Sequence, residues 1–281
     1  MEELWGARQS VTAGLTITPK FLPRFNFNVD YYRIKIIGFI SYVDPYIAFI
    51  QCQAGEDFYC SRYNRDTVSG RIDVAGSYAD NRPANFGRQI NEGVDFNTSY
   101  RFDTLEVFNK DLGAIDVNFV GNLRTKNEQH KLPGQPVFDC TGYYGYGGKE
   151  NCGSAPSAAW RHTLRVVWAV PWSGLAVNGL WRYGGAVKYS GLSSNPVLST
   201  PPTATDAIIS RQSAYLPAAS LFDLGATIKI GKVSSLRLTI NNVLDKDPYL
   251  MVNNHGGWYN TQPQMYDVFG RKITIGFSTA L

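Results

Sequence analysis

The sequence has few charged residues and no long uninterrupted hydrophobic run. Asp, Glu, Lys and Arg make up 18% of its 281 residues, below the roughly one quarter that is usual for soluble domains. Even the apolar stretch from Ile36 to Ile50 is interrupted by Asp44 and Pro45, so no segment approaches the ~18 to 20 apolar residues of a membrane-spanning helix. We therefore expect any membrane role to depend on β-strands.

The first residues show no signal-peptide pattern, and the sequence has no basic cluster. Its first ten residues, MEELWGARQS, have neither the basic nor the apolar region of a secretory signal. The formal net charge is only +4, and the Lys and Arg residues are scattered along the chain. This charge distribution argues against nucleic acid as a partner.

Residues with catalytic or metal-binding chemistry are sparse. The three histidines, His130, His162 and His255, are too dispersed for a zinc helix motif, and no GxSxG or Walker sequence occurs. We therefore predict that the chain is not an enzyme and has no catalytic residues, no metal site and no cofactor. His255, in the segment NNHGGWYN, is a weak candidate for contact with a ligand, although a solvated loop residue is the simpler interpretation.

The four cysteines form two near pairs, Cys52 with Cys60 and Cys140 with Cys152. In an oxidising compartment each pair would close a loop, which stabilises the fold by about 2.5 to 3 kcal/mol in the chain-entropy estimate. We therefore regard the pairs as candidate loop disulfides. Free thiols remain an alternative, and a four-cysteine zinc site is disfavoured because no CxxC spacing is present.

What the sequence does contain is aromatic residues, at 14%, and a repeated alternation of apolar and polar positions. In residues 222 to 230, for example, Phe222, Leu224 and Ile228 occupy one face, and Asp223 and Lys229 the other. A period of two residues predicts β-strands. We predict nine strand segments, at residues 11–17, 25–31, 94–102, 115–124, 164–170, 175–183, 222–230, 236–240 and 273–281.

The connections between these segments alternate in length. Short connections such as PKFLPR, PWSG and GKVS alternate with long ones at about residues 38–86, 129–160, 188–215 and 244–266. This arrangement places all short turns at one rim of an up-and-down sheet and all long loops at the other. It is typical of transmembrane β-barrels, in which the apolar face meets lipid and the polar face lines the lumen. A soluble β-sandwich is the alternative, because alternation alone fits both.

Two features of this plan concern individual side chains. Asp44 and Pro45 are suited to the N-cap and first turn of a short helix in the long loop, and residues 70–79 suggest a short strand. The predicted luminal arginines would either attract an anionic solute or pair with luminal aspartates, and we favour pairing. The arginines are Arg101, Arg124, Arg165 and Arg237, and the aspartates are Asp95, Asp116 and Asp223.

Residues 236–281 carry a recognisable pattern. The segment LRLTINNVLDKDPY, a loop, and then YDVFGRKITIGFSTAL resemble the C-terminus of TonB-dependent outer-membrane receptors. The resemblance extends, less specifically, over nearly the whole chain. It implies that Asn241, Asn242, Leu244, Asp245, Lys246 and Tyr249 end the penultimate strand. It also implies that Tyr266, Gly270, Arg271, Phe277 and Leu281 form the C-terminal signal read by the barrel-assembly machinery, with Leu281 standing where most members have Phe.

The resemblance implies an all-β, antiparallel, up-and-down transmembrane barrel segment with short periplasmic turns and long extracellular loops. Residues 1–281 would be the C-terminal part of the receptor barrel, about nine of 22 strands, without the signal peptide, TonB box and plug. The implied function is active uptake across the bacterial outer membrane of a small-molecule ligand, such as a siderophore, vitamin B12 or a saccharide. The implied partners are outer-membrane lipid, the barrel-assembly machinery and, through the plug, the TonB complex. A passive porin and a soluble β-sandwich binding protein are the alternatives.

Overall fold

The computed structural model describes residues 7–145, 152–153, 155–171, 173–199, 214–251 and 260–280. The chain forms two compact units. The first comprises Met1–Val11, Arg33–Asn91 and Asn127–Asp139, and the second comprises Thr12–Tyr32, Glu92–Lys126 and Cys140–Leu281.

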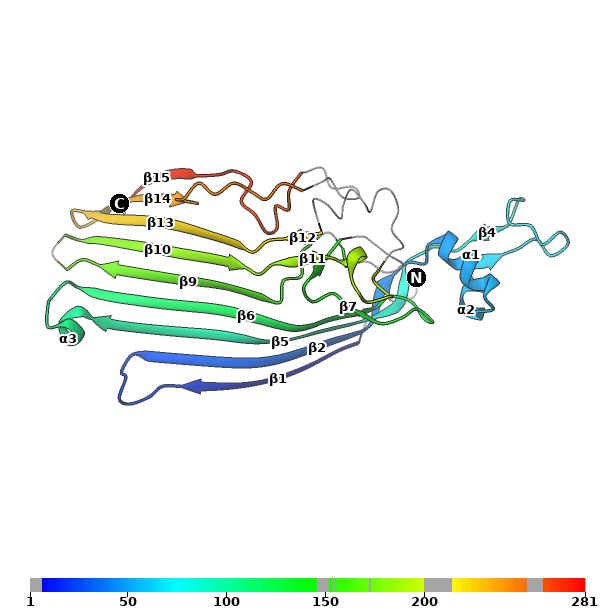
Figure 1. Ribbon diagram of the computed structural model, residues 1–281, viewed down its shortest axis with the longest axis horizontal. Helices are drawn as coiled ribbons and strands as arrows, with labels where there is room; N and C mark the ends of the chain where they lie inside the picture. The colour runs from blue at the N-terminus through cyan, green and yellow to red at the C-terminus, as the bar shows by residue number, and fades with distance from the viewer. Residues whose placement is uncertain are drawn as a thin grey trace. The chain divides into compact units, whose positions relative to one another are not determined.

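Nine strands follow one another across the main sheet in the order β1-β2-β5-β6-β9-β10-β13-β14-β15 (Figure 1). Every segment predicted from alternation corresponds to one of them, so the predicted strand number and antiparallel architecture are confirmed. Strands β1 and β15 are the outermost in this order. The nine strands are β1 (Ala7–Ile17), β2 (Phe25–Ser41), β5 (Ala84–Asp103), β6 (Ala114–His130), β9 (Trp160–Ala169), β10 (Leu175–Gly184), β13 (Ala219–Ile230), β14 (Ser234–Asn241) and β15 (Lys272–Thr279).

The strand register keeps apolar residues beside apolar residues. Val117 lies opposite Val166, which lies opposite Gly179, and Gly179 lies opposite Leu224. Neighbouring side chains along a strand point to opposite faces. One such row of paired residues therefore shows which residues of each strand it crosses lie on the apolar face. The same register places Asp116 beside Val167 on the other face.

Strands β2, β5 and β6 are longer than the alternation predicted. In β2 the apolar positions change from odd-numbered residues (Phe25, Phe27 and Val29) to even-numbered ones (Ile34 and Ile36), and further along Gly38 has φ 69° within the strand. A glycine with positive φ is typical of a β-bulge, which adds one residue and shifts the faces of everything beyond it. The extension therefore carries no continuous alternating pattern, although it is still strand.

The first unit contains two short helices, α1 (Pro45–Gln53) and α2 (Asp57–Cys60), and the strand pair β3 (Tyr63–Asn64) and β4 (Tyr78–Ala79). Asp44 caps α1, since its carboxylate accepts hydrogen bonds from the backbone N–H groups of Tyr46 and Ile47. The predicted helix is therefore confirmed. The predicted strand at 70–79 is wrong except for its last two residues, because the rest forms turns.

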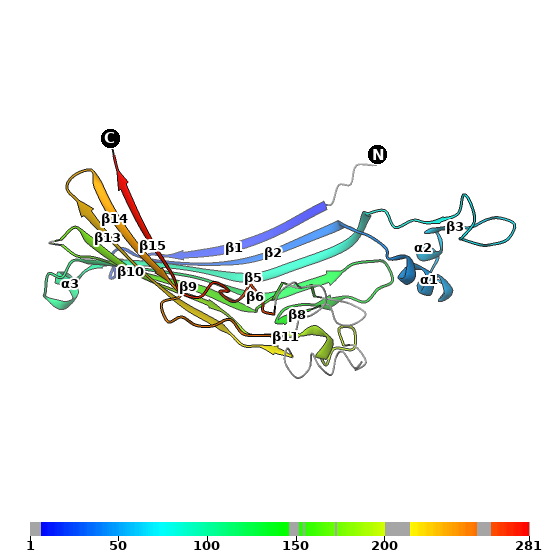
Figure 2. The same cartoon turned by 90° about the horizontal axis from the view of Figure 1, so that it is seen from above.

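Helices α1 and α2 lie side by side in both views (Figures 1 and 2). A disulfide joins Cys52 of α1 to Cys60 of α2. Val43, Ala48, Tyr59 and Leu132 form a small buried core next to it. The unit also contains β7 (Phe138–Asp139), which pairs with the end of β6.

The second unit contains most of the main sheet and a three-stranded sheet of β12 (Tyr215–Leu216), β11 (Val187–Tyr189) and β8 (Tyr143–Tyr144). A core of Tyr144, Val187, Tyr189 and Leu216 includes Ala219 at the start of β13. The unit also has a 3₁₀ turn, η1 (Ser190–Leu192), and a one-turn helix, α3 (Thr104–Phe108), between β5 and β6. No helix among the described residues is long and apolar enough to cross a membrane.

Candidate functional site

The polar face of the second unit is organised around a single carboxylate, Asp223 of β13. Arg182 of β10 donates two hydrogen bonds to it, with Nε 2.8 Å from Oδ2 and Nη2 2.9 Å from Oδ1. Only 7% of the Asp223 side chain is exposed, whereas 38% of the Arg182 side chain is. Such a two-pronged contact is among the stronger types of ion pair, so it fixes two neighbouring strands at this position.

Asp223 also organises the chain just after β14. Its Oδ1 accepts a hydrogen bond of 2.8 Å from the backbone N–H of Asn242, a fully buried residue. The Asn242 side chain in turn accepts from the N–H of Lys246 and donates to its carbonyl oxygen. Asn242 has φ 49°, a left-handed conformation that Asn tolerates better than most residues. The INNVLDK segment is therefore a side-chain-braced turn.

The two ends of the connection between β14 and β15 are joined to each other. Asp245 accepts a hydrogen bond of 2.9 Å from the backbone N–H of Arg271, and its other oxygen lies 3.7 Å from the Arg271 guanidinium. Gly270, with φ 67°, provides the turn that precedes β15. Three residues implied by the resemblance thus meet at the base of one loop.

Tyr266 is not at a strand end. It lies six residues before Lys272, the first residue of β15, and only 7% of it is exposed. Its hydroxyl donates to the carbonyl of Pro217, and burial raises the pKa of the phenol. Tyr266 therefore does not open β15, because its ring is packed inside the loop core.

Residues 263–269, in the connection between β14 and β15, lie against the polar face of the sheet. Together with the strands they line an open cavity of about 590 Å³. Arg182, Asp223 and Asn241 line it from the strands, and residues 263–269 line it from the connection. Lys272 also lines the cavity, as do the apolar side chains of Leu180 and Leu221, so the lining has both signs of charge but is partly apolar.

The predicted pairing of luminal arginines with aspartates occurs in part. Arg101 lies 3.6 Å from Asp116, but Asp95 accepts from the Asn122 side chain and Asp223 pairs with Arg182. Arg124 donates to the Ser157 hydroxyl at 2.9 Å. Arg165 and Arg237 form no ion pair with any residue that the structure describes.

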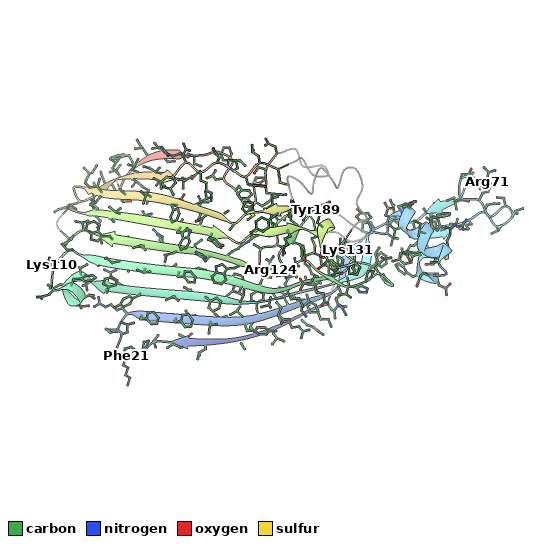
Figure 3. All side chains as sticks on the ribbon, viewed as in Figure 1. Phe21, Arg71, Lys110, Arg124, Lys131 and Tyr189 are labelled. Atoms are coloured by element: carbon green, nitrogen blue, oxygen red, sulfur yellow. A yellow bond between two sulfur atoms is a disulfide. The ribbon has the colours of Figure 1, made fainter. Side chains whose placement is uncertain are left out.

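The opposite face is apolar and exposed. Leu224, Leu238 and Ile275 are 45%, 38% and 71% exposed, and no second sheet covers them among the described residues. A soluble β-sandwich would bury this face in a dry core, so that alternative is wrong. Phe21, at the short turn between β1 and β2, is 88% exposed and projects away from the sheet (Figure 3).

Aromatic side chains gather on this apolar face at one level. His162 stacks on Tyr183 with ring centroids 4.9 Å apart, and it meets Trp181 edge-on at 4.5 Å. Trp160 donates to His162 Nδ1 at 2.8 Å. Rings with one polar atom suit the boundary between hydrocarbon and water.

Several predicted site residues belong to loops or to the end of the chain. His255 and Leu281 lie outside the described residues. Phe277 is on β15, opposite Leu236, and is 64% exposed on the apolar face. A second disulfide joins Cys140 to Cys152. Within the described ranges, no group of three or more His, Cys, Asp or Glu side chains has the arrangement of a metal site.

Sequence reasoning missed Arg161 and Arg182 as luminal residues. Arg161 precedes the strand segment predicted at residues 164–170, and the pairing of Arg182 with Asp223 depends on the register of β10 with β13. Their place in the alternation would have identified them. Arg161 is adjacent to His162 and Arg182 is adjacent to Trp181, so each arginine points to the face opposite its aromatic neighbour.

Comparison with protein families gives a match over residues 9–243 to the model described as "TonB dependent receptor-like, beta-barrel". Comparison with curated protein sequences gives no match. The chain is also similar in fold to solved structures of much longer proteins.

One is the ferric enterobactin receptor PfeA of Pseudomonas aeruginosa, in complex with enterobactin, with a TM-score of 0.57 and 12% identity. The FrpB iron transporter of Neisseria meningitidis has a TM-score of 0.54 and 15% identity. The siderophore receptor PirA of Acinetobacter baumannii has a TM-score of 0.55 and 12% identity. In each case 98% of this chain is covered, but only 31%, 31% and 32% of the other chain, respectively. The chain thus spans about a third of the length of these proteins.

Proposed function

Since the chain belongs to the TonB-dependent receptor-like β-barrel family, we propose that it supplies nine strands of the wall of an active transporter. Proteins of this family are bacterial outer-membrane receptors for transport rather than enzymes, and this chain is accordingly an outer-membrane protein. We propose further that residues 1–281 are the C-terminal part of the receptor barrel.

The observation that carries the proposal is the separation of the two faces of the sheet. The exposed row that contains Val166, Leu224 and Ile273 is apolar, while the face that contains Arg182 and Asp223 is charged and carries a cavity with both polar and apolar lining. A charged residue on a lipid-facing position costs ~2 to 4 kcal/mol at mid-depth. The clean apolar face is thus what contact with lipid requires, and the charged face suits a water-filled or plugged lumen.

We propose that the transported ligand is a small molecule that enters from the side of the long loops, with siderophores as the leading class. The similar structures are those of a ferric enterobactin receptor, an iron transporter and a siderophore receptor. Release of the ligand would depend on the TonB complex acting through a plug in the intact receptor. Vitamin B12 and saccharides remain candidate ligands of the same transport mechanism.

The loops and the chain end have roles within the same proposal. The Cys52–Cys60 and Cys140–Cys152 disulfides would hold the extracellular loops in shape. The segment from Tyr266 through Gly270, Arg271 and Phe277 to Leu281 would be read by the barrel-assembly machinery. Phe277 has the exposure needed for such recognition, since 64% of it is accessible on the outermost strand.

An uptake assay tests the proposal. Cells that carry the intact protein are starved of iron and given radiolabelled iron as a ferric siderophore, with and without a functional TonB system. We expect accumulation that requires both the protein and TonB. Equal uptake without TonB would favour a passive porin, and TonB-dependent growth on vitamin B12 or a saccharide alone would change the ligand class.

A further inference from the structure

A diagonal row of arginines crosses the polar face of the sheet near the long-loop ends of three strands. Arg161 of β9 lies opposite Asn122 of β6, and Arg124 lies two residues further along the same face of β6. Arg161 also lies opposite Gly184 of β10, two residues from Arg182. Diagonal neighbours of this kind are about 7 to 8 Å apart, within reach of long side chains. The row therefore brings three positive charges together.

Only one of the three arginines is neutralised by a carboxylate. Arg182 is paired with Asp223. Arg161 donates to the carbonyl oxygen of Pro156 at 2.5 Å, and Arg124 donates to the hydroxyl of Ser157. Those two acceptors orient the guanidinium groups but do not balance their charge. Within the described residues, Arg161 and Arg124 have no acidic partner.

The acceptors are themselves held in place. The carbonyl of Ser157 accepts from the N–H of Gly142, and the N–H of Ser157 donates to the carbonyl of Tyr143. Both contacts lie beside Cys140, which is disulfide-bonded to Cys152. Arg124 (Figure 3) also has its Nε buried without a hydrogen-bond partner. An unpaired buried N–H on a charged group is costly, and an acceptor from a ligand would satisfy it.

Small residues leave space next to Arg161. A cavity of about 140 Å³ is lined by Arg161 and Arg182 and bounded by Ala158, Gly184 and Ala219, among others. A Cβ atom added at Gly184 would meet no other atom within 4 Å. The space beside the guanidinium is therefore open rather than filled by packing.

We propose that Arg161 and Arg124 form a binding site for an anionic group, a carboxylate or phosphate, on a soluble small molecule that enters the lumen. The proposal rests on the proposed function, because it assigns this face to the lumen. Guanidinium groups match the geometry of carboxylates and phosphates through paired N–H donors. The transported ligand is therefore expected to carry a negatively charged group.

Calorimetric titration of the intact protein in detergent with citrate, and separately with inorganic phosphate, tests the site. We expect saturable binding of at least one of these anions, weakened by salt, and no binding of glucose. Arg161→Gln and Arg124→Gln should each weaken binding by roughly 10- to 100-fold, the range for a hydrogen bond to a charged group. Arg161→Lys should give a smaller loss and should preserve the fold.

Two further variants separate a built site from general charge. Arg237→Gln removes a positive charge from the same face, on β14 opposite Thr227 and Gly276, and should change the affinity by less than about twofold. Gly184→Leu keeps every charge but fills the cavity, and it should abolish binding. Absence of saturable binding by the wild type, equal loss in Arg237→Gln, or unchanged binding in Gly184→Leu would each overturn the proposal.

The titration is independent of TonB and of uptake. Anion binding without TonB-dependent uptake would therefore contradict the proposed transport function and leave the site intact. Uptake without anion binding would contradict the anion site and leave the proposed transport function intact.

Discussion

Val166 and Val167 are adjacent, identical in type and on opposite faces of β9, so they offer a matched test of which face meets lipid. Val166 lies in the apolar row, between Val117 and Gly179. Val167 lies between Asp116 and Asn178 on the polar face. We predict that Val166→Arg destabilises the protein in a bilayer and that Val167→Arg does not.

The magnitude follows from the depth of Val166. It is three residues from Ala169, the last residue of β9, or about 10 Å along the strand at ~3.4 Å per residue. With a strand tilt of about 45°, this corresponds to a depth of roughly 7 Å in an apolar band about 25 Å tall. An arginine costs ~2 to 4 kcal/mol at the midplane and ~0 to 1 near the interface. We therefore expect a loss of about 2 kcal/mol for Val166→Arg, or roughly 30-fold in the folding equilibrium.

The assay is reversible denaturant unfolding of the intact protein in phosphatidylcholine vesicles, with both variants and the wild type measured in parallel. Val167→Arg should fall within about 1 kcal/mol of the wild type, because its guanidinium reaches water and approaches Asp116. Equal destabilisation of the two variants, or a larger loss for Val167→Arg, would refute the assignment of the faces.

Three other predictions concern the polar face and the loops. Asp223→Asn should reduce the free energy of unfolding by ~1 to 3 kcal/mol in the same assay, because it leaves Arg182 and the N–H of Asn242 with a weaker acceptor. An unchanged free energy of unfolding would contradict the stabilising role of Asp223. Cys52→Ser should speed proteolysis of the loop that contains α1 and α2, since the disulfide constrains the unfolded loop by about 2.5 kcal/mol in the chain-entropy estimate, and an unchanged cleavage rate would oppose this. The hydrogen bonds from Arg82 lower the pKa of Asp80 to about 2. Their stabilisation of the loop is therefore complete above the usual Asp pKa near 4 and is lost as the pH falls toward 2. The rate of hydrogen exchange around Asp80 should rise as the pH falls through this range in the wild type but not in Asp80→Asn.

The strands of the main sheet were predictable because the same physical requirement acts along each one. Where one face is apolar and the other polar, the period of two residues is visible without any partner strand, as in Phe222 to Ile230. The extension of β2 was not predictable in this way, since the apolar positions change from odd to even numbers between Val29 and Ile34, and Gly38 with its positive φ follows. The short strands β8, β11 and β12 have two or three residues each, too few to show a period.

The candidate site was less predictable because it depends on register. The alternation identifies Asp223 as a luminal residue. It does not show that Asp223 pairs with Arg182 and not with one of the four predicted luminal arginines. Likewise, the sequence does not show that Tyr266 is buried. Only the fold shows that its ring lies in a core and that its hydroxyl donates a hydrogen bond to the carbonyl oxygen of Pro217. Contacts between distant segments of the chain decide such outcomes.

The most direct test of the account is a spin-label scan along β13, from Leu224 through Gly225, Ala226 and Thr227 to Ile228, in the intact protein in lipid vesicles. All four native cysteines are in disulfides, so each introduced cysteine would be the one free thiol of this chain. We expect the labels at 224, 226 and 228 to be accessible to oxygen dissolved in the hydrocarbon, and those at 225 and 227 to be accessible to a water-soluble nickel reagent. Accessibility without this alternation, or with its sense reversed, would contradict the claim that the apolar face meets lipid.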